Sequence, residues 1–156
     1  MVRLEPVPAD STRARTLLSE YFEMRGEAFP KGQNYRPVFP AASVFTPPAG
    51  VFVVVVDDEG ADVGCGGIRR VADGPAGVRY EVKHLYLRRE TRGRGWGRLL
   101  LEDLERRARE WGAGELVLDT HHTLEAAGAL YARTGFTAIE PYNDNPNATR
   151  WYGKAL

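Results

Sequence analysis

Cysteine, net charge and long apolar runs are all scarce in this chain of 156 residues. The one cysteine, Cys65, cannot form a disulfide within the chain, and there is no CxxC motif or Cys/His zinc spacing. Basic and acidic residues number 21 each, which excludes nucleic-acid binding through overall charge. No apolar run reaches the ~18 residues of a membrane span, and Met1–Pro6 lacks an apolar signal core. We therefore expect a cytoplasmic protein with no metal and no nucleic-acid or membrane partner.

The length and composition are those of one globular domain. Apolar residues make up 43% of the chain and charged residues 27%, both ordinary for a folded enzyme-sized domain. We expect a single domain over residues 1–156. Residues 1–87 should hold an N-terminal helix and antiparallel strands, and residues 88–156 a glycine-rich loop followed by a β-α-β-α-β half.

Hydrophobic periodicity and turn residues give the expected elements. Helical spacing predicts three helices, and one further short helix is expected in the proline-rich segment Gly26–Gly50. The helices are expected at Thr12–Arg25, Trp96–Trp111 and Leu124–Thr134. Strands are expected at Val2–Val7, Val51–Asp57, Asp62–Val71, Val78–Leu87, Glu115–Asp119, Phe136–Glu140 and Thr149–Ala155.

The segment Arg92-Gly93-Arg94-Gly95-Trp96-Gly97 lies between a predicted strand and a predicted helix. Its glycines allow a tight turn, and the free N–H groups of the helix start, with Arg98 beside them, suit a pyrophosphate group. A dinucleotide on a Rossmann unit is the alternative ligand. Arg98 stands where that fingerprint needs its third glycine, and the first half of the chain is antiparallel, so the alternative is disfavoured.

Three motifs in a fixed order resemble the GCN5-related N-acetyltransferase (GNAT) family. Arg92-x-x-Gly95-x-Gly97 follows the strand His84–Leu87, the strand Leu116–Asp119 follows Gly114, and Leu130–Phe136 matches the family's Y-x-x-x-G-F. The resemblance extends over about Glu81–Phe136. The tract Pro141–Pro146 also resembles the tail of a branch with small-molecule substrates.

The resemblance implies acetyl-CoA as the donor and a primary amine as the acceptor. It also implies an α/β (α+β) fold with about four helices and a mixed sheet of six to seven strands. That sheet is splayed between the strand ending near Leu87 and the strand Glu115–Asp119, so that the amides of the pantetheine arm can pair with the freed backbone. The donor contacts it implies are Leu85, Tyr86, Leu87, Arg92, Gly93, Arg94, Gly95, Trp96, Gly97, Arg98, Thr120 and His121.

The same resemblance implies direct attack of the amine on the thioester, with no covalent enzyme intermediate. Tyr131 would protonate the leaving thiolate, and Glu81 would act through water as the base. His84 is a competing base, because imidazole titrates near neutrality. Cys65 is interpreted as a packing residue rather than a nucleophile. His121-His122 is not interpreted as a metal site, since neighbouring side chains on an extended segment point apart.

The acceptor pocket should come from aromatic and polar residues outside the motifs. We expect Tyr21 and Glu23 on the first helix, the segment Phe29–Phe39, and Tyr142 with Asn143. Two other functions stay open: a non-catalytic acyl-CoA sensor and a protein or peptide N-terminal acetyltransferase. Trp151–Leu156 could also form the interface strand of a homodimer.

Overall fold

A computed structural model describes residues 1–31 and 35–156. In chain order, the elements are β1 (Arg3–Pro6), α1 (Thr12–Ala28), the 3-10 helix η1 (Ala42–Phe45), β2 (Gly50–Val56), β3 (Asp62–Gly74), β4 (Gly77–Leu87), the 3-10 helix η2 (Arg89–Thr91), α2 (Trp96–Glu110), β5 (Glu115–Thr120), α3 (Glu125–Arg133), β6 (Thr137–Ala138) and β7 (Arg150–Ala155). Among these residues, no helix is both long and apolar enough to cross a membrane.

The seven strands form one mixed sheet in the order β1-β2-β3-β4-β5-β7-β6. Every neighbouring pair is antiparallel except β4 and β5, which run parallel. The predicted mixed sheet is therefore confirmed. The strand predicted at Phe136–Glu140 keeps only its residues Thr137 and Ala138 as β6, at the edge of the sheet.

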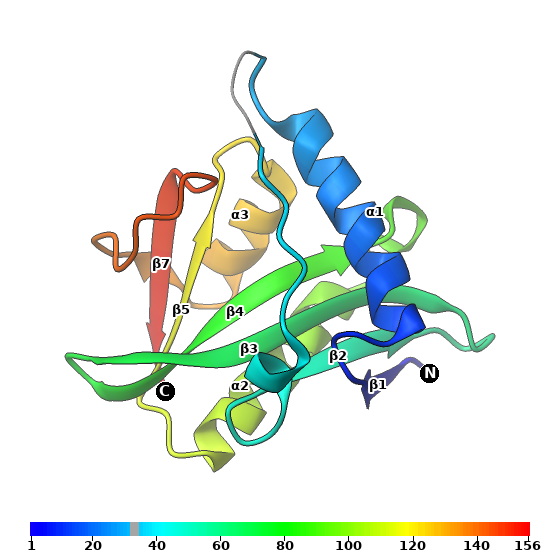
Figure 1. Cartoon of the computed structure of the whole chain (residues 1–156). Coiled ribbons are helices and arrows are strands. Elements are labelled where there is room, and N and C mark those ends of the chain that lie inside the picture. The colour runs from blue at the N-terminus through cyan, green and yellow to red at the C-terminus, as the bar shows by residue number, and fades with distance from the viewer. Residues whose placement is uncertain (32–34) are drawn as a thin grey trace.

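The helices cover the two faces of the sheet (Figure 1). The period of two along β2 directs Phe52 and Val54 toward α1, and Val53 and Val55 toward α2. Leu17 and Leu18 of α1 complete one apolar layer, and Leu100 and Leu104 of α2 complete the other. Each of these side chains is excluded from solvent, so the sheet is a fixed platform between two cores.

The strands β4 and β5 separate after a short parallel contact. They pair only from Arg79 to Glu81 on β4, against Glu115 to Val117 on β5. Beyond that contact the two strands diverge, as Figure 1 shows. The predicted splay of the sheet is thus confirmed, and the facing backbone groups of both strand ends lack a ladder partner from each other.

A β-bulge in β4 lies where the splay opens. The pairing with β3 shifts between Cys65 and Gly67, so that His84 and Leu85 both face Gly66. His84 takes a left-handed backbone conformation, with φ at 58°, which is uncommon for a residue with a side chain. Glycine at position 66 leaves room for its neighbours, because an added Cβ would lie 3.2 Å from the Leu85 side chain and 3.1 Å from the Leu100 side chain.

Candidate functional site

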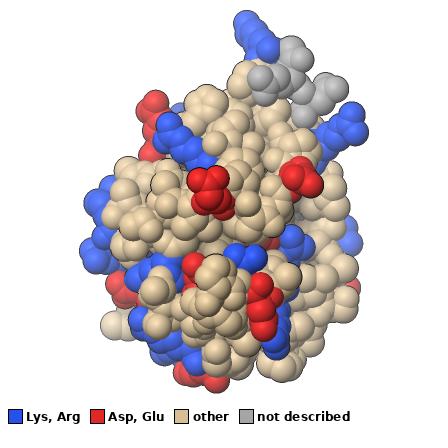
Figure 2. Space-filling view, turned by 90° about the vertical axis from the view of Figure 1, so that its left-hand side faces the viewer, with Lys and Arg blue, Asp and Glu red and all other residues tan. Residues whose placement is uncertain are grey.

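A cavity of about 1120 Å³ extends from the glycine-rich loop, across the splayed strands, to the C-terminal end of α1. It is lined by side chains from both helical layers and from β4 and β5. On the face drawn in Figure 2, basic and acidic side chains are interspersed, in keeping with the zero net charge.

The glycine-rich loop ends in an uncapped helix. Gly93 and Gly95 both have positive φ, at 83° and 80°, and only glycine adopts this backbone freely. Gly95 is the N-cap of α2, and no side chain accepts a hydrogen bond from the helix start. The first N–H groups of α2, from Trp96 to Arg98, are therefore free to bind an anion, with the positive end of the helix dipole behind them.

The arginines around this loop do different things. Arg92 and Arg98 line the cavity, as does Arg89. Arg94 was expected at the ligand, but it lies over the Trp96 ring at 5.2 Å and is not among the lining residues. Arg88 is held by Glu20, whose carboxylate accepts from its Nε at 2.9 Å and its Nη2 at 2.8 Å. Arg89, Arg92 and Arg98 are therefore the arginines placed to give an anion its counter-charge, and of these Arg98 is also paired with Glu102 at 3.2 Å.

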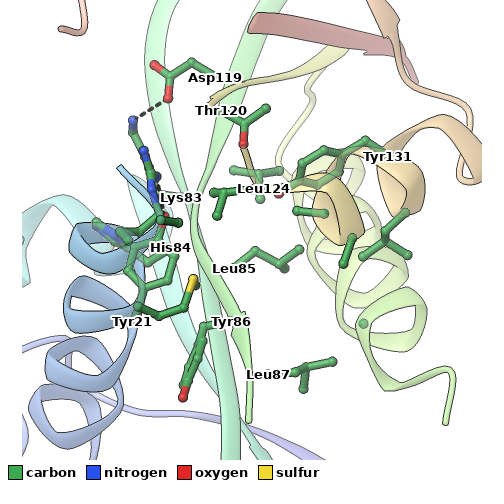
Figure 3. Close-up of a pocket in the computed structure, with 18 of the residues that line it drawn as sticks. Tyr21, Lys83, His84, Leu85, Tyr86, Leu87, Asp119, Thr120, Leu124 and Tyr131 are labelled. Carbon is green, nitrogen blue, oxygen red and sulfur yellow. Dashed lines mark hydrogen bonds and ion pairs between the residues drawn. The ribbon is translucent and has the colours of Figure 1, made fainter. Parts of the chain in front are cut away.

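The bulged strand divides the cavity into two halves (Figure 3). Leu85 and Leu87 point toward α2 and α3 and belong to the core on that face. His84 and Tyr86 point the other way, toward α1, where their rings lie 5.7 Å and 6.2 Å from the ring of Tyr21. We call the half beside α2 and α3 the donor half, and the half beside α1 the acceptor half.

Tyr131 of α3 lies on the donor half of the cavity and is only 6% exposed. Among the described residues, no group accepts a hydrogen bond from its hydroxyl, although other buried tyrosines here have such partners. Burial raises the pKa of Tyr131, nearby Tyr21 raises it further, and Arg25 opposes the shift. The phenol therefore keeps its proton at neutral pH and has it available for a ligand.

Glu81, the expected base, does not line the cavity. Its side chain is fully buried, and both oxygens are engaged: Oε1 accepts from Arg69 Nε at 2.8 Å, and Oε2 accepts from the Tyr142 hydroxyl at 2.6 Å. Burial, followed by the charge of Glu81, raises the pKa of Tyr142. Tyr142 is therefore a half-buried partner of this carboxylate and, contrary to expectation, does not line the cavity.

A second carboxylate, Asp119 at the end of β5, does line the cavity. Its Oδ1 accepts from Lys83 Nζ at 3.0 Å, and its Oδ2 accepts from Asn143 Nδ2 at 2.7 Å. Burial by itself would raise the pKa of Asp119, but Lys83 and Asn143 outweigh it and lower the pKa. Nothing in the sequence marks this pair beyond two charged residues on predicted strands, so Lys83 was not among the expected site residues.

His84 lines the acceptor half but is a poor base. Burial lowers its pKa to about 3, and Lys83, Arg69 and Arg25 act in the same direction. The imidazole is therefore neutral across the physiological range and binds a proton too weakly to remove one from an ammonium group.

Some of the other expected site residues line the cavity and some do not. Tyr21, Asn143 and Thr120 line the cavity, whereas Glu23 and His121 do not. Glu23 is exposed on the outer side of α1. His121 is buried, with its ring 4.9 Å from Phe29. Of the segment expected to line the acceptor pocket, residues 32–34 lie outside the described residues.

The structure also bears on two alternatives considered from the sequence, a nucleophilic cysteine and a metal site. Cys65 is fully buried in the core beneath α1, and burial raises the pKa of its thiol, as expected for a packing residue. In the ranges 1–31 and 35–156, no three His, Cys, Asp or Glu side chains are grouped to hold a metal ion.

Comparison with known proteins gives one consistent result. Residues 13–136 match the model of the acetyltransferase (GNAT) family. The chain is 37% identical over 102 residues to an uncharacterized N-acetyltransferase of Schizosaccharomyces pombe, and 35% identical over 96 residues to an IAA acetyltransferase of Azospirillum brasilense. These matches cover 65% and 60% of this chain, and 61% of the length of each relative. An acetyltransferase of the same family from Staphylococcus aureus has a TM-score of 0.80 at 16% identity, over 100% of this chain and 99% of that one.

The buried His84 predicts a loss of stability in mild acid. Its pKa is near 3 in the folded protein and near 6.5 in an unfolded chain. Below pH 6.5 the unfolded chain therefore binds a proton that the folded one does not, and the free energy of unfolding falls by up to about 1.4 kcal/mol per pH unit. His84→Asn, which tolerates the same backbone, should flatten the dependence of stability on pH between 6.5 and 4.5 in urea unfolding. His122→Asn, at an exposed site, is the matched control, and equal slopes in all three proteins would contradict this.

Proposed function

The chain belongs to the GNAT acetyltransferase family, and from this premise we propose that it transfers an acetyl group from acetyl-CoA to the primary amine of a small molecule. One observation carries the proposal. A single cavity joins an uncapped helix start, two strand ends that do not pair with each other, and a buried phenol whose hydroxyl has no acceptor among the described residues.

The donor half fits the parts of acetyl-CoA in order. The N–H groups at the start of α2, with Arg92 and Arg98, suit the pyrophosphate. The strand end Val82–Leu87 offers backbone groups to the pantetheine amides, which would complete the ladder that β4 and β5 leave open. Leu85 and Leu87 supply an apolar floor beneath that arm.

Acetyl-CoA brings an activated thioester, so little is asked of the protein beyond orientation and one proton. Tyr131 would donate its hydroxyl proton to the sulfur as the thiolate leaves. The acceptor half would hold the amine on the other side of β4, facing the carbonyl carbon, so that attack is direct.

The base that would take the proton from the amine is less well supported by the structure than the acid, Tyr131. Glu81 was expected to act through water, but Arg69 and Tyr142 occupy both of its oxygens. His84 holds a proton too weakly. We infer that the amine loses its proton to solvent in the open cavity, and that Glu81 positions Arg69 and Tyr142. Because neither Glu81 nor His84 is suited to act as a base, a non-catalytic acyl-CoA sensor is the second candidate function.

Small-molecule acceptors are favoured over peptides by the wall of the acceptor half. Aromatic side chains from α1 and the chain that follows it, Phe22, Tyr35 and Phe45 among them, line this half and narrow it. An extended peptide would need an open groove there.

Calorimetric titration with acetyl-CoA, CoA and NAD in parallel tests the donor assignment. We expect binding of the two CoA species and none of NAD, because the loop lacks the third glycine of a dinucleotide site. Release of free thiol with a panel of amines then separates an enzyme from a sensor. Binding of NAD alone would overturn the proposal, and CoA binding without thiol release from any amine would favour the sensor.

Tyr131→Phe should lower kcat by about 100-fold, because it removes the proton donor and leaves the ring in place. The Kd for acetyl-CoA should change less than about twofold, since the donor's phosphates and amides are bound elsewhere. Tyr152→Phe is the matched control, because that ring lies 6.1 Å from Tyr131 and outside the cavity. Equal kcat in the two variants would remove Tyr131 from the mechanism.

Glu81→Gln separates a base from a positioning residue. We expect the acidic limb of the pH dependence of kcat/KM to persist, while the free energy of unfolding falls by about 1–3 kcal/mol through the weakened bonds to Arg69 and Tyr142. Glu115→Gln, which changes a carboxylate of the neighbouring strand β5 that also does not line the cavity, controls for loss of charge. Disappearance of the acidic limb only in Glu81→Gln would restore this residue as the base.

A further inference from the structure

Arg25 is the one lysine or arginine in the described ranges that is buried, with only 8% of its surface exposed. It lies near the C-terminal end of α1 and lines the acceptor half of the cavity. Its guanidinium lies over the rings of Tyr21 and Tyr35, at 5.9 Å and 5.2 Å. Aromatic faces stabilise a cation but do not neutralise it.

No carboxylate of this chain pairs with Arg25. Among the described residues, none comes within 4.0 Å of its guanidinium nitrogens, and residues 32–34 are Gly, Gln and Asn. The neighbouring cations differ, since Arg69 is paired with Glu81 and Lys83 with Asp119. A buried cation without a counter-charge is unfavourable for folding, which points to a role for Arg25 other than stability.

The guanidinium also has donors to spare. Nη1 donates to the Tyr21 hydroxyl at 3.0 Å, and Nη2 donates to the Asn147 backbone carbonyl at 2.9 Å. Arginine carries five N–H donors in a fork that matches a carboxylate. The two bonds fix the fork in place and leave the rest of it for a ligand.

Arg25 is close to the reacting groups. Its charge acts on the pKa of Tyr131, after burial and Tyr21, and on the pKa of His84, after burial, Lys83 and Arg69. Arg25 and Tyr131 also line the same cavity, so a group bound to Arg25 would share that cavity with the proposed proton donor. Phe22 and Phe45, which line the same half, offer apolar surface next to it.

We propose that Arg25 binds a carboxylate of the acceptor, so that the substrate is an amino acid with an apolar side chain rather than a simple amine or a peptide N-terminus. This inference rests on the proposed function for the amine, and adds to it the anionic group that the acceptor must carry. The amino group would face the thioester while the carboxylate occupies the free side of the Arg25 fork.

Matched probes titrated into the CoA-bound protein test this without turnover. Phenylalanine is compared with phenylalaninamide and phenethylamine, which keep the amine and lack the carboxylate. It is also compared with 3-phenylpropanoate, which keeps the carboxylate and lacks the amine. Leucine and methionine with their carboxamides extend the set to other apolar side chains. We expect each carboxylate to bind about 10- to 100-fold more tightly than the counterpart that lacks the carboxylate, the range of a charge-assisted hydrogen bond. Equal binding within a pair, or no binding of any carboxylate, would overturn the proposal.

Arg25→Gln should reduce that preference by at least about tenfold while leaving the Kd for acetyl-CoA unchanged. Arg15→Gln is the matched control, because Arg15 is on the same helix and also lies over an aromatic ring, that of Phe39, but is exposed. A purely structural Arg25 would instead weaken the acid and amide probes equally and lower the melting temperature. If Arg25→Gln fails to fold, the wild-type pairs decide.

Thiol release with the same probes separates this inference from the function beneath it. Release that is as fast with phenethylamine and phenylalaninamide as with phenylalanine would remove the carboxylate and keep the acetyltransferase. Tight binding of the carboxylates with no release from any amine would remove the acetyltransferase and keep the Arg25 site.

Discussion

The separation of β4 from β5 after Glu81 is the constraint on which the rest of the structure depends. A parallel pair that continued to Leu87 would fill its own ladder and close the sheet, leaving no backbone for a ligand. The bulge at His84 and Leu85 accompanies the separation, and beyond it the strand's period of two points Leu85 and Leu87 to one face of β4 and Tyr86 to the other. β4 thereby provides an apolar surface for the donor half on one face and an aromatic surface for the acceptor half on the other. In the proposed reaction, the thioester and the amine would meet at the gap between β4 and β5.

The loop between β6 and β7 is bonded to the elements around this opening through a partly buried network of polar side chains. Tyr142 bonds Glu81 of β4, Asn143 bonds Asp119 of β5, and Asn147 accepts from Arg25 of α1. The three bonds connect one loop to the three elements that border the acceptor half. Trp151 strengthens the loop's hold on β5 by donating to the Asn143 side chain at 2.9 Å, because linked hydrogen bonds polarise one another. The loop therefore helps to set the shape of the cavity as well as covering it.

The sequence predicted those features that depend on local pattern. The turn at Gly93 and Gly95, the helix after it and the buried strand β2 each have a local physical cause, and the sequence predicted all three. Residues that act through distant partners were harder to assign. Glu81 was expected at the cavity because its position on the strand was known, but its burial depends on Arg69 and Tyr142, which lie 12 and 61 positions away. Arg25 and Lys83 were missed for the same reason, since only the fold shows which cation has a carboxylate beside it.

The unpaired state of Arg25 also bears on the acid. Burial and Tyr21 raise the pKa of Tyr131, and the Arg25 cation opposes them. A carboxylate bound to Arg25 would cancel that opposition and hold the proton on the phenol until negative charge develops on the sulfur. A carboxylate of the protein in the same place would neutralise Arg25 permanently and leave an acidic substrate no counter-charge to bind. A buried cation without its own partner is therefore what a site needs if the substrate is to supply the missing charge.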